Sequence, residues 1–309
     1  MTRVLCVGEC MIELRHADAT TMHLSYAGDT YNTAVYLRRT VSALGVPAEI
    51  GYLTGLGDDE YSEDMRAAWA AEGVTDRAVR VKGHLPGLYT VRVDERGERR
   101  FAYWRSASAA RELFSGTDWI DHLDGDVIHL SGVTLQLATP KTRDALIERL
   151  DILRARGTRL SLDTNYRPAG WHSADEAAEA MDQVSRLATI VFATLDEDTA
   201  MYGSRTAAEA ADRLAHLGVP EAVVKTGADG AHVRADGQLR HVPARPVEQV
   251  VDTTAAGDAF AGGYLAARIA GVSPFGATAV AVEVAGAVVA HPGAIIPAGT
   301  PLLTSRKSP

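Results

Sequence analysis

The chain of 309 residues is long enough to bury a large core, and 46% of its residues are hydrophobic. It carries 31 Lys plus Arg against 40 Asp plus Glu, a formal net charge of −9, so its overall field repels nucleic acid and anionic membranes. We therefore predict no nucleic-acid partner and no membrane partner, and we expect basic groups to gather locally wherever an anionic ligand binds.

The N-terminal stretch, MTRVLCVGEC, lacks the basic region, long apolar run and cleavage site of an export signal. Both cysteines, Cys6 and Cys10, fall on the first predicted strand and its continuation, without further Cys or His at metal-site spacing. The most apolar later stretch, residues 277–290, contains Glu283 and is too short and too polar to span a bilayer. These features predict a cytoplasmic protein with two thiols in its core.

Strand-like and helical patterns alternate along most of the chain. Strands are predicted at residues 3–7, 126–131, 159–163, 188–194 and 221–226. Helices are predicted at about 30–44, 58–72, 140–155, 174–187 and 206–217, and a glycine follows four of these patterns, at Gly45, Gly73, Gly157 and Gly218. The alternation predicts one α/β domain over residues 1–309, with a mostly parallel central sheet and helices on both faces.

Residues 88–105, LYTVRVDERGERRFAYWR, break this alternation, because they predict two strands around a polar turn at 94–97 with no helix between them. Either an ordinary edge hairpin or a lid over a site fits the pattern. Side chains alternate along a strand, so Tyr103 and Arg105 share one face and Trp104 lies on the other. One face can therefore stack on a small ligand and pair with its charge, which favours the lid.

Residues 27–39, AGDTYNTAVYLRR, place Gly28 and Asn32 just before or within the first turn of a helix. Asp29 or Thr30 can simply be the N-cap of that helix. A second polar group follows the strand at 159–163, because SLDTNYRPAGW ends in Pro and Gly. Asn165, Tyr166 and Arg167 are therefore expected at the carboxyl edge of the sheet, where open α/β sheets bind ligands.

A further loop opens from the strand in VVKTGADGAHV, residues 223–233. Lys225 and Thr226 follow the buried strand, and Gly227 and Gly230 come next. The two glycines fit the turn of a hairpin as well as a loop beside a nucleotide, since a short glycine motif is weakly specific.

The stretch VVDTTAAGDAFAGGYLAARIAG, residues 250–271, places an acid where a late helix begins. The pattern predicts the end of a strand at residues 250–251 and a helix from near Gly257. Small residues leave the unpaired N–H groups of the first turn open to an anion. Asp258 is then either a first-turn acid that interacts with the helix dipole, worth about 0.3–1 kcal/mol, or a general base beside a transferring phosphoryl group.

Residues 252–260, DTTAAGDAF, resemble the C-terminal signature of the ribokinase-like (pfkB-type) carbohydrate kinases. The resemblance covers nearly the whole chain and implies a Rossmann-type three-layer sandwich with a small β-sheet lid, formed discontinuously and including about 88–105. In that family the last aspartate of the motif is the catalytic base and the Ala-Ala-Gly-Asp backbone forms an anion hole. The resemblance thus implies these roles for Asp258 and for Ala255, Ala256 and Gly257.

The resemblance implies binding roles elsewhere too. Gly28 and Asn32 match residues that face the sugar, with Ala27 in place of the family's first glycine. Glu197 matches the glutamate of an Asn-x-x-Glu element that helps organise Mg²⁺ and the phosphates, while Thr194 replaces the asparagine. ATP and Mg²⁺ are the implied cofactors, and the residues expected along ATP are Asn165, Lys225, Thr226, Gly227, Ala228, Gly230, Ala256 and Gly257.

Several segments are similar to those members of the family that phosphorylate 2-keto-3-deoxygluconate, namely GECMIEL at 8–14, GDTYNTAVYL at 28–37, LPGLY at 85–89, YWR at 103–105, NYRP at 165–168, DTTAAGDAFAGGYLA at 252–266 and GAIIP at 293–297. The sugar-acid contacts this implies are Gly28, Tyr89, Tyr103, Arg105, Arg167 and Asp258. Two guanidiniums on separate elements also suit an acidic sugar better than a neutral one. The expected reaction transfers the γ-phosphoryl group of ATP to the 6-hydroxyl.

Three other functions remain open from the sequence. A fructokinase or another sugar kinase of the family fits the same motifs. An NAD-dependent oxidoreductase shares the alternating pattern, but Gly8 is followed by ECMIEL rather than by G-x-G-x-x-G. A non-catalytic sugar-binding descendant would not need Asp258 next to Gly257. We also predict a homo-oligomer, with a dimer formed through exposed lid strands.

Overall fold

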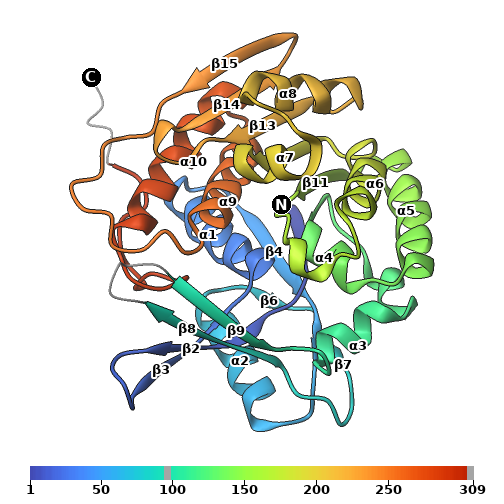
Figure 1. Ribbon diagram of the computed structural model, residues 1–309, viewed down its shortest axis with the longest axis vertical. Helices are drawn as coiled ribbons and strands as arrows, with labels where there is room; N and C mark the ends of the chain where they lie inside the picture. The colour runs from blue at the N-terminus through green and yellow to red at the C-terminus, as the bar shows by residue number, and fades with distance from the viewer. Residues whose placement is uncertain (94–98, 305–309) are drawn as a thin grey trace.

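The computed structural model describes residues 1–93 and 99–304 and is built around a nine-stranded sheet (Figure 1). Its strand order is β15-β14-β13-β12-β11-β10-β1-β4-β6, parallel except for β14 and β15 at one edge. The strands are β1 (Thr2–Val7), β4 (Ala48–Leu53), β6 (Thr75–Asp76), β10 (Val127–Ser131), β11 (Arg159–Asp163), β12 (Ile190–Thr194), β13 (Glu221–Lys225), β14 (Ala231–Ala235) and β15 (Gln238–Val242). All five strands expected from the sequence are present in this sheet.

Helices cover both faces of the sheet, which confirms the predicted α/β class. One core, with α1, α9 and α10, packs alternate strand residues such as Val4, Phe192 and Val223, and the core on the other face includes Leu5, Ile128 and residues of α5, α6 and α8. The helices are α1 (Asp29–Ala43), α2 (Glu60–Ala71), α3 (Ala109–Ser115), α4 (Gly132–Leu137), α5 (Pro140–Ala155), α6 (Ala174–Ser185), α7 (Leu195–Tyr202), α8 (Ala207–His216), α9 (Ala256–Ile269) and α10 (Pro274–Val289).

Local chemistry explains where several helices begin and end. Thr139 caps α5 through the Thr142 N–H and is followed by proline, while Ser173 caps α6 through the N–H of Glu176. The four glycines predicted to follow helices all have positive φ, between 67° at Gly45 and 94° at Gly157. The sequence signals for these boundaries are therefore confirmed.

A smaller sheet of order β3-β2-β8-β9 lies below the body in Figure 1, and we refer to it as the lid. It consists of β2 (Met11–His16), β3 (Met22–Ala27), β8 (Gly87–Val93) and β9 (Arg99–Trp104). The predicted hairpin is the antiparallel pair β8 and β9, and the turn expected at 94–97 lies outside the described residues. The lid's inner face packs Met11, Ala27, Tyr89 and Val91 against Ala294, with Ala255 beside them. The lid therefore meets the segment that follows α10 and the start of α9.

The prediction of a strand that ends at residues 250–251 is wrong. The last strand of the sheet ends at Val242, and Val250 and Val251 are 58% and 50% exposed. The N–H of Val251 donates to the carbonyl of Val289 at the end of α10 (2.8 Å). This segment crosses a helix end and has no strand beside it to pair with, which is why two β-branched residues do not make a strand there.

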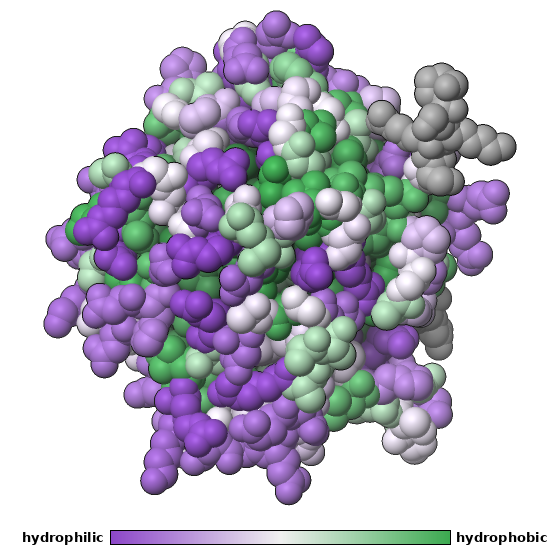
Figure 2. All heavy atoms as spheres, turned by 180° about the vertical axis from the view of Figure 1, so that it is seen from behind, coloured by the Kyte–Doolittle hydropathy of each residue, from purple (hydrophilic) through white to green (hydrophobic). Residues whose placement is uncertain are grey.

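The surface is mixed in character. Figure 2 shows hydrophobic side chains gathered across the middle of the rear face, between charged ones. No helix among the described residues is long and apolar enough to cross a membrane. Cys6 and Cys10 are buried free thiols, as the sequence predicts.

Candidate active site

The start of α9 carries the candidate base and lies against α1. The side-chain amide of Asn32 donates to Oδ2 of Asp258 (2.8 Å), and the Thr33 hydroxyl donates to the Asp258 carbonyl (3.2 Å). Asn32 and Asp258 are 226 positions apart in the sequence. The packing of α1 on α9 therefore brings together a predicted sugar-binding residue and the predicted base.

The turn before α9 is held in an uncommon backbone conformation. Ala255 has φ 60° and ψ 8°, in the left-handed region, which costs of order 1–3 kcal/mol for a residue other than glycine. The first N–H groups of a helix lack intrahelical partners. The N–H of Ala256 donates to the Thr253 carbonyl (3.3 Å), so Gly257 and Asp258 supply the better placed donors for an anion.

A buried ammonium group lies beside these donors. Nζ of Lys225, at the end of β13, lies 2.7 Å from Oδ2 of Asp163 at the end of β11. A Cβ built on Gly257 would fall 3.2 Å from the same Nζ, so this glycine and the ammonium are direct neighbours. Burial lowers the pKa of Lys225, but Asp163 and Glu197 outweigh it and hold the pKa above its ordinary value. Lys225 therefore stays charged next to the turn before α9.

The surroundings of Asp258 adjust its acidity. Burial and the nearby carboxylate of Asp29 raise its pKa to about 7, while the hydrogen bond from Asn32 and the charge of Lys225 oppose the rise. A carboxylate with a pKa near neutrality can accept a proton from an attacking hydroxyl far better than an ordinary aspartate. The geometry suits general-base catalysis better than a purely structural role at the helix start.

Asn165 and Asp29 connect the loop after β11 to the start of α1. Nδ2 of Asn165 donates to Oδ2 of Asp29 (2.7 Å), and Asn165 itself has φ 32°. The N-cap of α1 is Gly28, without a side-chain cap, so the expectation that Asp29 or Thr30 caps this helix is wrong. The carboxylate of Asp29 links the two segments, because its Oδ2 accepts from Asn165 while its Oδ1 accepts from the Thr30 N–H (2.8 Å).

Both predicted carboxylate-binding arginines are already paired with glutamates. Nη1 of Arg167 lies 2.6 Å from Oε1 of Glu197, whose other oxygen accepts from the Tyr166 N–H (3.2 Å). Arg105 forms an ion pair with Glu9, whose side chain is 1% exposed. Glu197, expected to help organise magnesium, is therefore also the partner of Arg167, and each arginine has a protein carboxylate on one side.

Glu9 lies where the body meets the lid, and the sequence analysis did not single it out. Its Oε1 accepts from the Ser108 hydroxyl (2.5 Å), and burial raises its pKa against the opposing effect of Arg105. A Cβ on Gly87 would fall 2.7 Å from Oε1 of Glu9. The available signal was an acid directly after a buried apolar strand, which predicts a charged partner elsewhere in the fold.

The lid tyrosines are in ring contact with each other at a tilted angle. The rings of Tyr89 and Tyr103 are 5.7 Å apart, and Tyr103 also stacks on Phe101. The Tyr89 hydroxyl donates to Oε2 of Glu13 (2.5 Å), and the side chain of Tyr89 is buried in the lid. Tyr103 is 52% exposed, so part of its ring is open to a ligand where it stands.

The glycine loop after β13 is a tight turn into β14. Gly227 and Gly230 have φ 61° and 104°, and both the N–H and the hydroxyl of Thr226 donate to the Gly230 carbonyl (2.9 and 3.0 Å). This is the hairpin turn that the sequence allowed. It also lies at the carboxyl end of β13 next to Lys225, where the predicted nucleotide residues, Ala228 included, would meet a ligand.

Gly28 lies too close to the backbone of Glu9 to carry a side chain. A Cβ on Gly28 would fall 2.1 Å from the backbone oxygen of Glu9, which cannot move aside. We expect Gly28→Ala to lower the free energy of unfolding by about 1–3 kcal/mol through this overlap. Urea unfolding of the variant beside Gly45→Ala, where a Cβ meets nothing within 4 Å but φ is 67°, separates crowding from backbone strain. Equal losses in the two variants would contradict the steric explanation.

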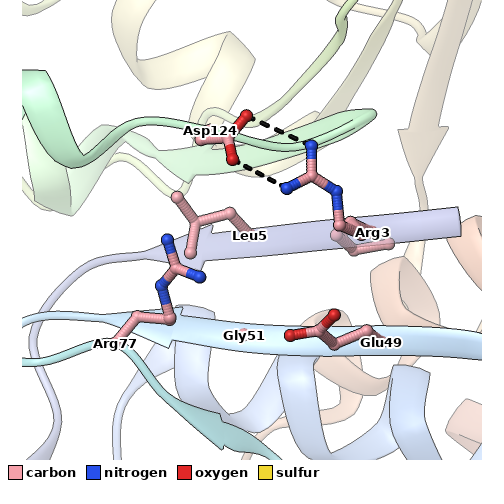
Figure 3. Close-up of a pocket in the computed structure, with 7 residues that line it drawn as sticks. Arg3, Leu5, Glu49, Gly51, Arg77 and Asp124 are labelled. Carbon is pink, nitrogen blue, oxygen red and sulfur yellow. Dashed lines mark hydrogen bonds and ion pairs between the residues drawn. The ribbon is translucent and has the colours of Figure 1, made fainter.

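Another hollow lies at the opposite, amino-terminal edge of the sheet (Figure 3). It is lined by the surface ion pair of Arg3 and Asp124 (2.7 Å), with Glu49 and Arg77 beside it. None of the predicted site residues lies there. Among residues 1–93 and 99–304, no three His, Cys, Asp or Glu side chains are grouped so as to hold a metal ion. The candidate site is therefore the carboxyl edge around Asp258.

The central sheet, the smaller sheet and the glycine-containing start of α9 fit a sugar kinase of the ribokinase type, and the match to known proteins agrees. Residues 1–301 match the pfkB family of carbohydrate kinases, so the chain belongs to this family. The 2-dehydro-3-deoxygluconokinase of Escherichia coli (strain K12) is 39% identical over 303 residues, with 96% of this chain and 97% of the relative covered.

Solved structures show the same fold. The PfkB protein from Polaromonas sp. JS666 superposes with a TM-score of 0.80 at 25% identity, covering 94% of this chain and 96% of that one. Aminoimidazole riboside kinase from Salmonella enterica, complexed with aminoimidazole riboside and an ATP analog, gives 0.79 at 23% identity, with 94% of each chain covered. The predicted three-layer fold and the family assignment are confirmed.

Proposed function

We propose that the protein is an ATP-dependent kinase that phosphorylates 2-keto-3-deoxygluconate, also called 2-dehydro-3-deoxygluconate, at its 6-hydroxyl. The observation that carries the proposal is Asp258, with a pKa of about 7, in the first turn of α9, where Gly257 and Asp258 supply the N–H groups placed for an anion. Membership of the pfkB family and the similarity to a named 2-dehydro-3-deoxygluconokinase support the same assignment.

The reaction uses Asp258 as base. The 6-hydroxyl oxygen of the sugar attacks the γ-phosphorus, its proton passes to the Asp258 carboxylate, and the bond from the γ-phosphorus to the β–γ bridging oxygen breaks to leave ADP. The N–H groups at the start of α9 stabilise the charge on the transferring group. Asn32 orients the base, because its amide holds Oδ2 of Asp258 and leaves the other oxygen for the hydroxyl.

The sugar acid lies between body and lid in this proposal. Arg105 and Arg167 each have one edge bound by a glutamate, and a guanidinium has five N–H donors, so a second edge remains for the substrate carboxylate. Tyr103 provides an exposed ring over the sugar, and Tyr89 packs against it. Gly28, without a side chain, allows the start of α1 to lie close to the backbone of Glu9.

The nucleotide lies along the loop after β13 and the start of α9. The residues proposed to contact it are Asn165, Lys225, Thr226, Gly227, Ala228, Gly230, Ala256 and Gly257. Mg²⁺ suits the oxygen donors here, because the Glu197 carboxylate is 19% exposed at the carboxyl edge of the sheet and each of its oxygens keeps a lone pair. Glu197 would hold the ion through water, and the ion would neutralise phosphate charge.

An ATP-coupled assay tests the substrate. We expect turnover with 2-keto-3-deoxygluconate to exceed turnover with fructose or ribose by at least about a hundredfold in kcat/KM, because neutral sugars leave two arginines without a carboxylate. The acid derived from galactonate, which differs at C4, belongs in the same series. Preferential release of ADP with fructose would favour a fructokinase instead.

The pKa of Asp258 predicts the pH dependence. The base must be ionised, so kcat should fall about tenfold per pH unit below a pKa of about 7 and level off above it. Rates measured in the single-turnover regime over the range from about pH 5.5 to about pH 9 isolate the chemical step. A rate that does not change across the acidic half of this range would contradict the assignment of the base.

We also propose that two copies pair through the lid and that the protein is cytoplasmic. β9 is an edge strand with Tyr103 and Trp104 52% and 61% exposed, and edge strands with exposed aromatic residues favour pairing. The buried free thiols and the use of ATP support the compartment. Light scattering of Trp104→Lys against the unaltered protein tests the dimer, which should dissociate; a dimer of unchanged affinity would rule out this surface.

A further inference from the structure

We propose that Lys225 is a catalytic residue that contacts the γ-phosphoryl group during transfer, with Asp163 as the positioning residue that holds its ammonium beside the N-terminus of α9. This inference rests on the proposed kinase function and goes beyond it, because the glycine loop implies only a nucleotide contact for Lys225. It assigns a defined reaction step to one side chain.

The position of Nζ carries the argument. It lies 2.7 Å from Oδ2 of Asp163, and a Cβ on Gly257 would come within 3.2 Å of it. The donors of the anion-binding turn and the ammonium therefore face the same small volume. An anion that reaches the N–H groups of α9 also meets Nζ.

Burial strengthens the electrostatic effect of the Lys225 ammonium on a nearby anion. The side chains of Lys225 and Asp163 are only 11% and 6% exposed, so water screens their charges little. Asp163 cannot move with a ligand, since it ends β11 and its Oδ1 accepts from the Asn165 N–H (3.2 Å). Lys225 thus needs no reorganisation when negative charge develops on the equatorial oxygens of the phosphoryl group.

The positive charge of Lys225 also stabilises the leaving group. As the bond from the γ-phosphorus to the bridging oxygen breaks, electrons pass to the β-phosphate oxygen of ADP, and the ammonium stays protonated throughout. Asp258 alone takes the proton from the sugar hydroxyl. Lys225 would therefore change the charge balance of the transition state without adding a proton transfer.

The test compares nucleotide affinities. Lys225→Met alone leaves Asp163 as an unpaired buried carboxylate, which can unfold the protein, so the informative variant is Lys225→Met/Asp163→Asn. Asp163→Asn alone is the matched control: the asparagine oxygen still accepts from the Asn165 N–H, and the Lys225 ammonium, which loses Asp163, keeps the nearby negative charge of Glu197. The dissociation constants of ADP and of a non-hydrolysable ATP analog are measured by calorimetry with Mg²⁺, and kcat is measured with the sugar acid.

We expect the control to bind the ATP analog more tightly than ADP, and the double variant to lose at least about tenfold of that preference together with about two to three orders of magnitude in kcat. A double variant that keeps the preference, or loses affinity equally for both nucleotides, would overturn the proposal. Affinities do not need a sugar, so a wrong substrate assignment leaves this result interpretable.

Discussion

Replacing Asp258 with asparagine should lower kcat by about two to four orders of magnitude, while the thermal midpoint and the KM for ATP stay close to those of the unaltered protein. The asparagine fills the same space, and its side-chain oxygen can still accept the hydrogen bond that Asn32 donates to Asp258 (2.8 Å). What it cannot do is accept the proton of the sugar hydroxyl. The steady-state assay with saturating ATP measures the loss directly.

The matched control for this variant is Asn32→Ala, which removes the hydrogen-bond partner of Asp258. That change keeps the carboxylate and removes the amide that lowers its pKa, so the acidic limb of the pH profile should move to higher pH with a smaller loss of kcat above it. Near-normal turnover of Asp258→Asn would remove the base from the mechanism. A large loss in both variants at high pH would instead mean that position, not proton transfer, limits the rate.

The sequence predicts the elements of the fold well because their signals are local. A strand or helix pattern, a capping serine or threonine and a glycine after a helix all lie within a few residues of the boundary that they mark. The exceptions have a physical cause. β3 is not predicted because it is largely exposed on the lid and so lacks the clear alternation of a half-buried strand.

The site is predictable only in part. A single motif supplies Asp258 and the anion-binding turn, and alternation along a strand places Tyr103 on one face of the lid. The pairs that set the charges join distant positions: Asn32 and Asp258 are 226 residues apart, and Glu9 and Ser108 are 99 apart. One sequence does not show which acid meets which base, so the roles of Glu9, Asp29 and Asp163 emerge only from the fold.

The ion pair between Arg105 and Glu9 changes the effects expected when Arg105 is replaced. Because Arg105 is an expected contact of the sugar acid, Arg105→Ala should weaken use of the sugar acid more than binding of ATP. In the fold it also leaves Glu9, whose side chain is 1% exposed, without its cation. Removing one partner of a buried ion pair costs about 3–5 kcal/mol, so this variant should be strongly destabilised as well, as urea unfolding would measure.

The double variant Glu9→Gln/Arg105→Gln separates the two effects, because it removes both charges and keeps polar groups near the Ser108 hydroxyl. We expect it to recover most of the stability lost in Arg105→Ala, yet to keep a KM for the sugar acid raised about ten- to a hundredfold, with the KM for ATP unchanged. Glu9→Gln alone shows what the glutamate contributes. If the double variant bound the sugar acid as tightly as the unaltered protein, Arg105 would serve to neutralise Glu9 at the junction of lid and body, and Arg167 would be left as the residue that recognises the carboxylate.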